Sequence, residues 1–308
     1  MSSAPEDPGS AQEGGTHSPE PLKNISPEGL FGRFFLHWIS LSVTIKANTY
    51  RRFPMNQHQA FFTRIGLDPE TKIEYTVDLL GRIQTACVLS IAYENLDILA
   101  GKPILLTPEA LFDKIITCGR GGYCFELNGL LTHMLRDMGF SVSERFARFL
   151  RGEREIPMRR HRVTVVSLPD GDYLLDIGVG QIAPRLPLKI TEGVIQEQNG
   201  ESYRFRRDSV HGWVLEDLHH GEWRDYIGFS DDLAFDVDFL QPSFFCEAHP
   251  DSVFNKAPMI AIKTPAGRCT IDGRTYKEFI GEDLVHMEEN VTDQRFDELL
   301  TTIFKLKG

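Results

Sequence analysis

The sequence predicts an α+β protein in which a helical part is followed by an antiparallel sheet or barrel. Between residues 56 and 140, apolar residues recur at the three- and four-residue spacing of amphipathic helices. From residue 141 to about residue 230, apolar and polar residues alternate, and turn sequences such as Pro169-Asp170-Gly171-Asp172 separate the runs. Two further strands and a helix close the chain.

Composition supports a globular core and excludes some classes of function. The 308 residues are 41% hydrophobic and 25% charged, as in ordinary globular proteins. A net charge of −11 disfavours nucleic-acid binding, which needs a basic face. The five cysteines form no CxxC pair, so neither a metal site nor a disulfide framework is expected. We therefore expect a protein of the reducing cytoplasm.

The first 55 residues differ from the rest. Residues 1–28 are rich in Pro, Ser, Gly and Glu, which predicts disorder, and they lack the basic start of a secretory signal. An apolar stretch at residues 30–45 is shorter than the ~20 residues that cross a bilayer, so a docking arm or an additional edge element is expected. A gene-model artefact is the alternative, and residues 1–55 are treated as a poorly ordered extension.

Three helices are expected before residue 140. A stripe at Leu79, Ile83 and Cys87 marks the first. Thr107-Pro108-Glu109 predicts a helix start, since it combines a capping hydroxyl, a proline and an early acid. The third begins at or near Cys124 and ends at Gly139; its apolar face comprises Leu127, Leu130, Leu131, Met134 and Met138.

Strands follow. His161 opens a run that alternates through Val163 and Val165, and residues 173–177 are the expected partner strand across the turn. Further strands are expected near Tyr203, Trp213 and Trp223, and over 259–264 and 268–271. Thr292 caps a final helix whose apolar face contains Phe296, Leu299, Leu300 and Ile303.

Cys124 is the first candidate catalytic residue. A cysteine at a helix N-terminus faces unpaired N–H groups and the positive dipole end, which stabilise a thiolate and lower the thiol pKa. The alternative is an inert buried cysteine.

His161 and Asp176 are the candidate base and its orienting acid. A nucleophilic thiol needs a base, and the base needs a group that holds it. If the turn between their strands has an even residue count, both side chains lie on one face of the sheet. The alternative is that Asp176 caps residues 177–180 and that His161 is an edge residue with no catalytic part.

Several motifs together resemble the arylamine N-acetyltransferase family, over about residues 56–306. The resemblance rests on Arg120-Gly121-Gly122-Tyr123-Cys124-Phe125-Glu126-Leu127-Asn128, His161-Arg162, Asp176-Ile177-Gly178-Val179-Gly180, Phe61-Phe62-Thr63-Arg64-Ile65-Gly66 and Ile91-Ala92-Tyr93-Glu94-Asn95-Leu96. The N-terminal extension fits a fungal member of this family.

The resemblance implies a helical bundle at 56–140 carrying the nucleophile, a β-barrel at 141–235 carrying His161 and Asp176, and an α/β lid at 236–308. It implies a triad arranged as in cysteine proteases. The implied activity moves an acyl group from acetyl-CoA, or another acyl-CoA, to arylamines or hydrazines through a Cys124 thioester, as in xenobiotic detoxification. No permanently bound cofactor, metal, nucleic-acid partner or membrane is implied.

The resemblance also implies further site residues. The expected CoA-binding residues are Gly178, Gly180, Gln181 and Ser252. The expected acceptor-binding residues are Tyr93, Phe125 and Val179. Arg120 and Glu94 are expected to form a structural salt bridge, with Arg120 as a substrate-anion ligand the alternative. The alternative is that these residues bind no ligand: the glycines would only form turns, and Tyr93 and Val179 would only pack in the core.

The chain departs from the family at several positions. Val179 replaces a frequent Phe, Gln181 a Gly, and Tyr93 a Phe. Arg159, Arg160 and Arg162 lie next to His161 in the sequence, although Arg162 should face away from it. We hypothesise that these groups favour a donor with a carboxylate, such as malonyl-CoA. Two further alternatives are a thiol hydrolase or transglutaminase-like enzyme, and a binding protein without activity. The sequence leaves the donor, the natural acceptor and the oligomeric state open.

Overall fold

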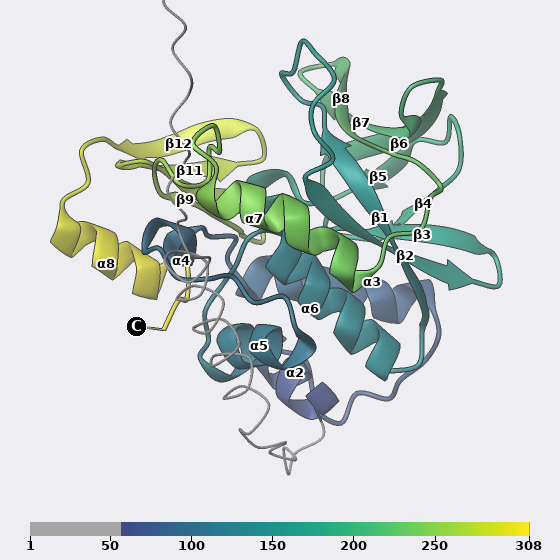
Figure 1. Ribbon diagram of the computed structural model, residues 1–308, viewed down its shortest axis with the longest axis horizontal. Coiled ribbons are helices and arrows are strands. Elements are labelled where there is room, and N and C mark those ends of the chain that lie inside the picture. Colours follow the sequence, from purple (N-terminus) through teal and green to yellow (C-terminus); the bar gives the residue numbers. More distant parts are fainter. Residues whose placement is uncertain (1–56, 308) are drawn as a thin grey trace, which may run out of the picture. The chain divides into compact units, whose positions relative to one another are not determined.

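The computed structural model describes residues 57–307 and has the predicted mixed α+β fold (Figure 1). The predictions for residues 1–55 lie outside this part of the chain. The described residues belong to one compact unit. The secondary structure changes near residues 140 and 235, where we predicted domain boundaries. That these positions separate domains remains a prediction.

Helices dominate the chain before residue 140. They are α2 (Gln57–Ile65), α3 (Val77–Ser90), α4 (Leu96–Leu99), α5 (Pro108–Phe112), the π-helix η1 (Asp113–Thr117) and α6 (Cys124–Asp137). Thr107 caps α5 as predicted, by accepting a hydrogen bond from the Ala110 N–H. After one turn, however, α5 widens into η1. Gly139 follows α6 with φ +91°, a conformation that glycine adopts without strain.

An eight-stranded antiparallel sheet follows, in the order β4-β3-β2-β1-β8-β7-β6-β5. Its strands are β1 (Ser141–Phe149), β2 (His161–Leu168), β3 (Gly171–Leu175), β4 (Leu188–Lys189), β5 (Gln196–Gln198), β6 (Glu201–Asp208), β7 (Gly212–His219) and β8 (Glu222–Phe229). The two edge strands meet, since the Gln196 amide binds the N–H and the carbonyl of Lys189. The sheet is therefore a nearly closed barrel, as predicted.

A second antiparallel sheet, in the order β12-β11-β10-β9, precedes the C-terminal helix α8 (Asp293–Thr302). Its strands are β9 (Met259–Lys263), β10 (Gly267–Asp272), β11 (Thr275–Ile280) and β12 (Asp283–Glu288). Tyr93 exchanges backbone hydrogen bonds with Ala261 of β9, which joins this sheet to the helical part. The short helix η2 (Gly180–Ile182) lies between β3 and β4 in the sequence, and η3 (Asp236–Phe239) and α7 (Leu240–Ala248) lie between β8 and β9.

Helix α6 lies centrally, with the barrel-like sheet on one side and the four-stranded sheet and α8 on the other (Figure 1). Most of its residues are buried, including polar Glu126 and Asn128. Such a helix can hold a side chain rigidly against β1 and β2, on which it packs. No helix among residues 57–307 is long and apolar enough to cross a membrane.

Candidate active site

Cys124 is the first residue of α6, as predicted, and only 4% of it is exposed. Gly121 allows the chain to pass close to the preceding segment, because a Cβ there would lie 2.2 Å from the Ala92 carbonyl oxygen. The Glu126 carboxylate accepts the Tyr123 N–H at 3.1 Å and so closes the first turn of the helix. The cysteine is thus fixed by its own motif.

His161 and Asp176 form a buried pair beside it. His161 opens β2, and Asp176 directly follows β3, across a two-residue turn between Leu168 and Gly171. The even turn brings both side chains to one face, as the strand parity required. The His161 Nε2 lies 2.7 Å from Asp176 Oδ2, and both side chains are almost completely buried.

Asn128 holds this pair in place, a role that sequence reasoning missed. Its Nδ2 donates to Asp176 Oδ1 at 2.8 Å and to the Arg162 carbonyl, and its Oδ1 accepts the Ile177 N–H at 2.9 Å. Asp176 Oδ1 also accepts the Gly178 N–H at 2.8 Å. Asn128 lies four residues after Cys124, and this helical spacing is the signal that places both on one face.

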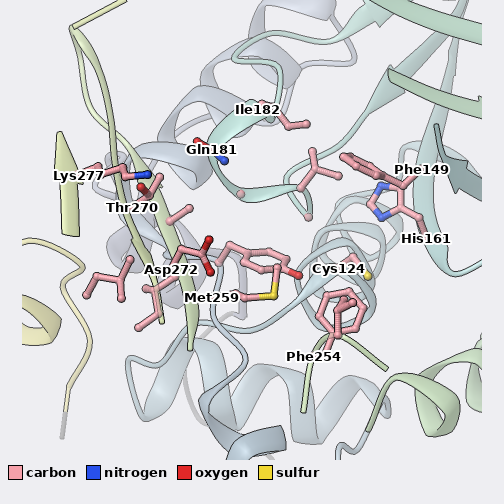
Figure 2. A pocket seen from close by; sticks show the side chains of 18 of the residues that line it. Cys124, Phe149, His161, Gln181, Ile182, Phe254, Met259, Thr270, Asp272 and Lys277 are labelled. Carbon is pink, nitrogen blue, oxygen red and sulfur yellow. The ribbon is translucent and has the colours of Figure 1, made fainter. Parts of the chain in front are cut away.

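A cavity of about 600 Å³ contains the thiol and the imidazole. Figure 2 shows Cys124, His161, Phe149 and Phe254 at one end of it. Because the Nε2 of His161 binds Asp176, Nδ1 is the ring nitrogen left for a group in the cavity. The cavity thus brings together a thiol that can act as a nucleophile, an imidazole that can act as a base, and a carboxylate that orients the imidazole.

The Cys124 thiol is not activated by its helix terminus alone. Burial raises its pKa well above the ordinary value, and Cys246 and Asp176 raise it further; the Phe125 N–H and Arg160 lower it by less. The Cys124 Sγ lies 3.8 Å from the Arg160 carbonyl, to which the thiol donates. The prediction of a lowered pKa from the helix N-terminus is therefore wrong, because burial raises the thiol pKa by more than the Phe125 N–H at the helix start lowers it. A thiolate here needs a proton acceptor beside it.

Arg120 forms the predicted salt bridge. Its Nη2 lies 2.8 Å from Glu94 Oε1, and its Nη1 lies 3.2 Å from Asp97 Oδ1. Lys114 joins the cluster through Asp97 and Glu126, at 2.8 and 2.7 Å. Burial opposes the ionisation of Asp97, but Lys114 and Arg120 lower its pKa to about 2. Arg120 is not among the residues lining the cavity, which favours the structural role over that of a substrate-anion ligand.

Most of the predicted ligand-binding residues line the cavity: Tyr93, Gly178, Val179, Gly180 and Gln181. Packing also requires a glycine at position 178, since a Cβ there would lie 2.8 Å from the Cys124 Cα. Gly180 has φ +59°, which a side chain would strain. Both glycines are thus needed by the fold itself, whatever they contact in a ligand.

Phe125 and Ser252 do not reach the cavity. The Phe125 ring is fully buried and packs on Tyr123 and Phe239. The Ser252 hydroxyl is also buried, donates to the Cys246 carbonyl at 2.5 Å and accepts the Phe254 N–H. Ser252 therefore shapes the turn that carries Phe254, and the geometry gives neither predicted residue a direct ligand contact.

The far end of the cavity was not predicted. Thr270 and Asp272 of β10 and Lys277 of β11 lie there with Gln181 (Figure 2). The three residues of β10 and β11 belong to strands with an ordinary pattern, and nothing in their sequence spacing separates them from other strand residues. Only the fold brings them to the same cavity as Cys124.

Comparison with known proteins gives the family. A family model described as N-acetyltransferase matches residues 76–307. The arylamine N-acetyltransferase of Mycobacterium tuberculosis (strain H37Rv) is 34% identical over 221 residues, which cover 70% of this chain and 77% of that protein. A Salmonella typhimurium relative, named arylamine N-acetyltransferase / N-hydroxyarylamine O-acetyltransferase, is 32% identical over 68% of this chain and 73% of its own.

Solved structures agree with the sequence relatives. The Salmonella typhimurium arylamine N-acetyltransferase structure has a TM-score of 0.77 at 29% identity, covering 82% of this chain and 92% of that chain. The Mycobacterium marinum enzyme, solved in complex with CoA, has a TM-score of 0.76 at 30% identity, covering 81% and 93%. The matched region includes Cys124, His161 and Asp176. The chain therefore belongs to the arylamine N-acetyltransferase family of acyltransferases.

Proposed function

We propose that this protein moves an acyl group from acetyl-CoA, or another acyl-CoA, to an arylamine or hydrazine by way of a thioester on Cys124. The observation that carries the proposal is the buried His161–Asp176 pair on the same cavity as the Cys124 thiol. A buried thiol with a raised pKa is a poor nucleophile until a base takes its proton. The proposed role of His161 Nδ1 is to take that proton.

The transfer has two half-reactions. In the first, the Cys124 sulfur attacks the thioester carbonyl, the bond from carbon to the CoA sulfur breaks, and the CoA thiolate takes the proton from His161. In the second, the amine nitrogen attacks the acyl-cysteine, an amide forms, and Cys124 leaves as a thiolate while the amine proton passes to His161. Asp176 stabilises the imidazolium, and Asn128 orients Asp176.

The roles of the cavity walls follow from this reaction. We propose that Gly178, Gly180 and Gln181 flank the acyl-CoA, and that Tyr93 and Val179 contact the acceptor. CoA then enters and leaves as a co-substrate, and no permanently bound cofactor is required. The five free cysteines fit work in the reducing cytoplasm.

Radiolabelled acetyl-CoA tests the proposal. The label should become attached to the wild-type protein at Cys124, remain absent from Cys124→Ala, and leave on addition of an arylamine as the labelled amide. Cys118→Ala is a matched control, because this free cysteine is exposed and lies outside the cavity. Label that is released to water at the same rate with or without amine would instead support a thiol hydrolase.

A malonyl donor is a second candidate, favoured by Arg160. Arg160 is among the residues that line the cavity, its side chain is 20% exposed, and Glu153 is its counterion at 3.8 Å. A carboxylate on the acyl group could form an ion pair with the Arg160 guanidinium. Arg159 is the matched control, because it lines a neighbouring groove rather than this cavity.

Turnover of malonyl-CoA and acetyl-CoA at matched concentrations decides between the donors. If malonyl-CoA is preferred, Arg160→Gln should abolish the preference and Arg159→Gln should keep it. Equal or better use of acetyl-CoA by the wild-type protein removes the malonyl proposal.

A further inference from the structure

Two hairpin turns from different sheets bring three potential metal ligands together, outside the cavity. His219 Nδ1 lies 2.6 Å from Glu282 Oε1, and His220 Nδ1 lies 3.0 Å from Glu282 Oε2. The ligand atoms of all three side chains lie within 4.8 Å of one another. Among residues 57–307 this is the one group of His, Cys, Asp and Glu side chains with that geometry.

The backbone of both turns presents these side chains. His219 ends β7, and His220 and Gly221 form the turn to β8. His220 has φ +48°, a left-handed conformation that is uncommon for a residue with a side chain. Glu282 lies in the turn between β11 and β12, after Gly281 with φ +55°. The two imidazole rings lie side by side, with centroids 4.2 Å apart.

This donor set has the chemistry of a zinc site. Zinc is bound by imidazole nitrogens and carboxylate oxygens, and three protein ligands leave a fourth position for water. Two imidazoles and one carboxylate are borderline ligands, which favour zinc, copper and nickel over calcium or magnesium. All three side chains are partly exposed, so an ion can enter without rearrangement of the core.

We propose that His219, His220 and Glu282 bind one divalent transition-metal ion, of which zinc is the prototype. The ion joins the barrel-like sheet to the four-stranded sheet at their turns. A neighbouring residue connects the site to the cavity rim: Arg268 donates to the Gly281 carbonyl at 2.8 Å and to Gln181 Oε1 at 3.2 Å. Binding therefore stiffens the wall that carries Gln181.

Titration of the full chain with zinc, in competition with a chromophoric chelator, tests the site. The wild-type protein should bind one equivalent that His219→Ala, His220→Ala and Glu282→Gln each weaken at least tenfold. His286→Ala is the matched control, because His286 is also an exposed imidazole 3.0 Å from a glutamate, Glu288, but has no third ligand. The control should bind zinc as the wild type does.

A second readout excludes zinc bound at a thiol. Saturating zinc should raise the melting temperature of the wild-type protein and of His286→Ala, and should leave that of the three site variants unchanged. Circular dichroism without metal establishes that the variants fold. Failure of the wild type to bind zinc, or equal zinc affinity in the wild type and all three site variants, would overturn the proposal and leave a simple His–Glu ion pair.

Discussion

At the Cys124 end of the cavity, His161, Asp176 and Asn128 are joined by hydrogen bonds between their side chains, whereas at the far end Asp272 and Lys277 have no side-chain partner among the described residues. His161, Asp176 and Asn128 are buried and joined by hydrogen bonds of 2.7 and 2.8 Å. Among the described residues, the side chains of Asp272 and Lys277 have no hydrogen-bond or ion-pair partner, although both line the same cavity. One end is preorganised, and the other is left with free polar groups.

This difference between the two ends of the cavity matches the different requirements of catalysis and of ligand recognition. Chemistry needs groups held to a fraction of an ångström, and buried hydrogen bonds supply that precision. Recognition of a ligand needs groups whose hydrogen-bonding capacity is still unused. Substitutions at the Cys124 end should therefore lower the rate of the chemical step, and those along the walls should change substrate affinity or selectivity.

The largest effect is expected for His161→Gln and Asp176→Asn. Each should reduce the transfer rate by about 10³- to 10⁴-fold, because the thiol loses its base or the base loses its orienting charge. Steady-state kinetics with an arylamine acceptor measures this. His286→Gln, which changes an exposed histidine on β12, should keep the wild-type rate. Retention of more than a tenth of the rate by both site variants would contradict the triad.

A matched pair of buried asparagines sharpens the comparison. Asn128 binds Asp176 and two backbone groups at the Cys124 end. Asn95 binds the backbone at Phe254, Ala257 and Met259, of which Phe254 and Met259 line the cavity. Asn128→Ala should lower kcat by about 100-fold, because Asp176 loses its orientation. Asn95→Ala should mainly raise KM, because it loosens Phe254 and Met259.

The pair also distinguishes positioning from stability. Both variants lose about 1–3 kcal/mol per buried group left unpaired, so their melting temperatures should fall alike. Equal effects of the two substitutions on kcat would mean that Asn128 is only structural.

The Arg120–Glu94 salt bridge should contribute mainly to the stability of the fold. Arg120→Gln leaves the completely buried Glu94 carboxylate without its cation and should cost about 3 kcal/mol of unfolding free energy. Urea denaturation measures the loss. Arg159→Gln is the control, since Arg159 has no ion pair among the described residues and should unfold at the wild-type urea concentration. If Arg120→Gln left the free energy of unfolding unchanged, the salt bridge would have no structural role.

The smallest effect is expected for Tyr93→Phe. The Tyr93 hydroxyl has no hydrogen-bond partner among residues 57–307, so its removal should change the unfolding free energy by less than about 1 kcal/mol. The ratio of turnover rates for acceptors with and without a polar ring substituent should change by about two- to tenfold. An unchanged ratio would mean that the hydroxyl contacts no acceptor.

The sequence predicted the preorganised end far better than the far end. Cys124, His161 and Asp176 lie in short local motifs, and a helix start and an even hairpin turn are enough to orient them. The Arg120–Glu94 bridge came from the family resemblance. Lys277 and Asp272 reach the cavity only because β10 packs beside η2 and β11 pairs with β10, and these long-range contacts have no local sequence pattern. The thiol pKa was mispredicted for a related reason, because burial depends on the whole fold.

The central claim is that the Cys124 thiolate exists only as a pair with the His161 imidazolium. The pH dependence of Cys124 alkylation by iodoacetamide, measured in the wild type and in His161→Gln, tests it directly. Burial alone raises the thiol pKa, and deprotonation of an isolated thiol increases as pH rises through that pKa. In the variant, rapid alkylation should therefore appear only well above pH 9, the ordinary thiol value.

The wild-type protein should instead react rapidly at neutral pH, since its thiol proton moves to the imidazole. The expected result is a large rate difference at pH 7 that narrows as the pH is raised. Identical alkylation rates and pH profiles for the two proteins would contradict the account.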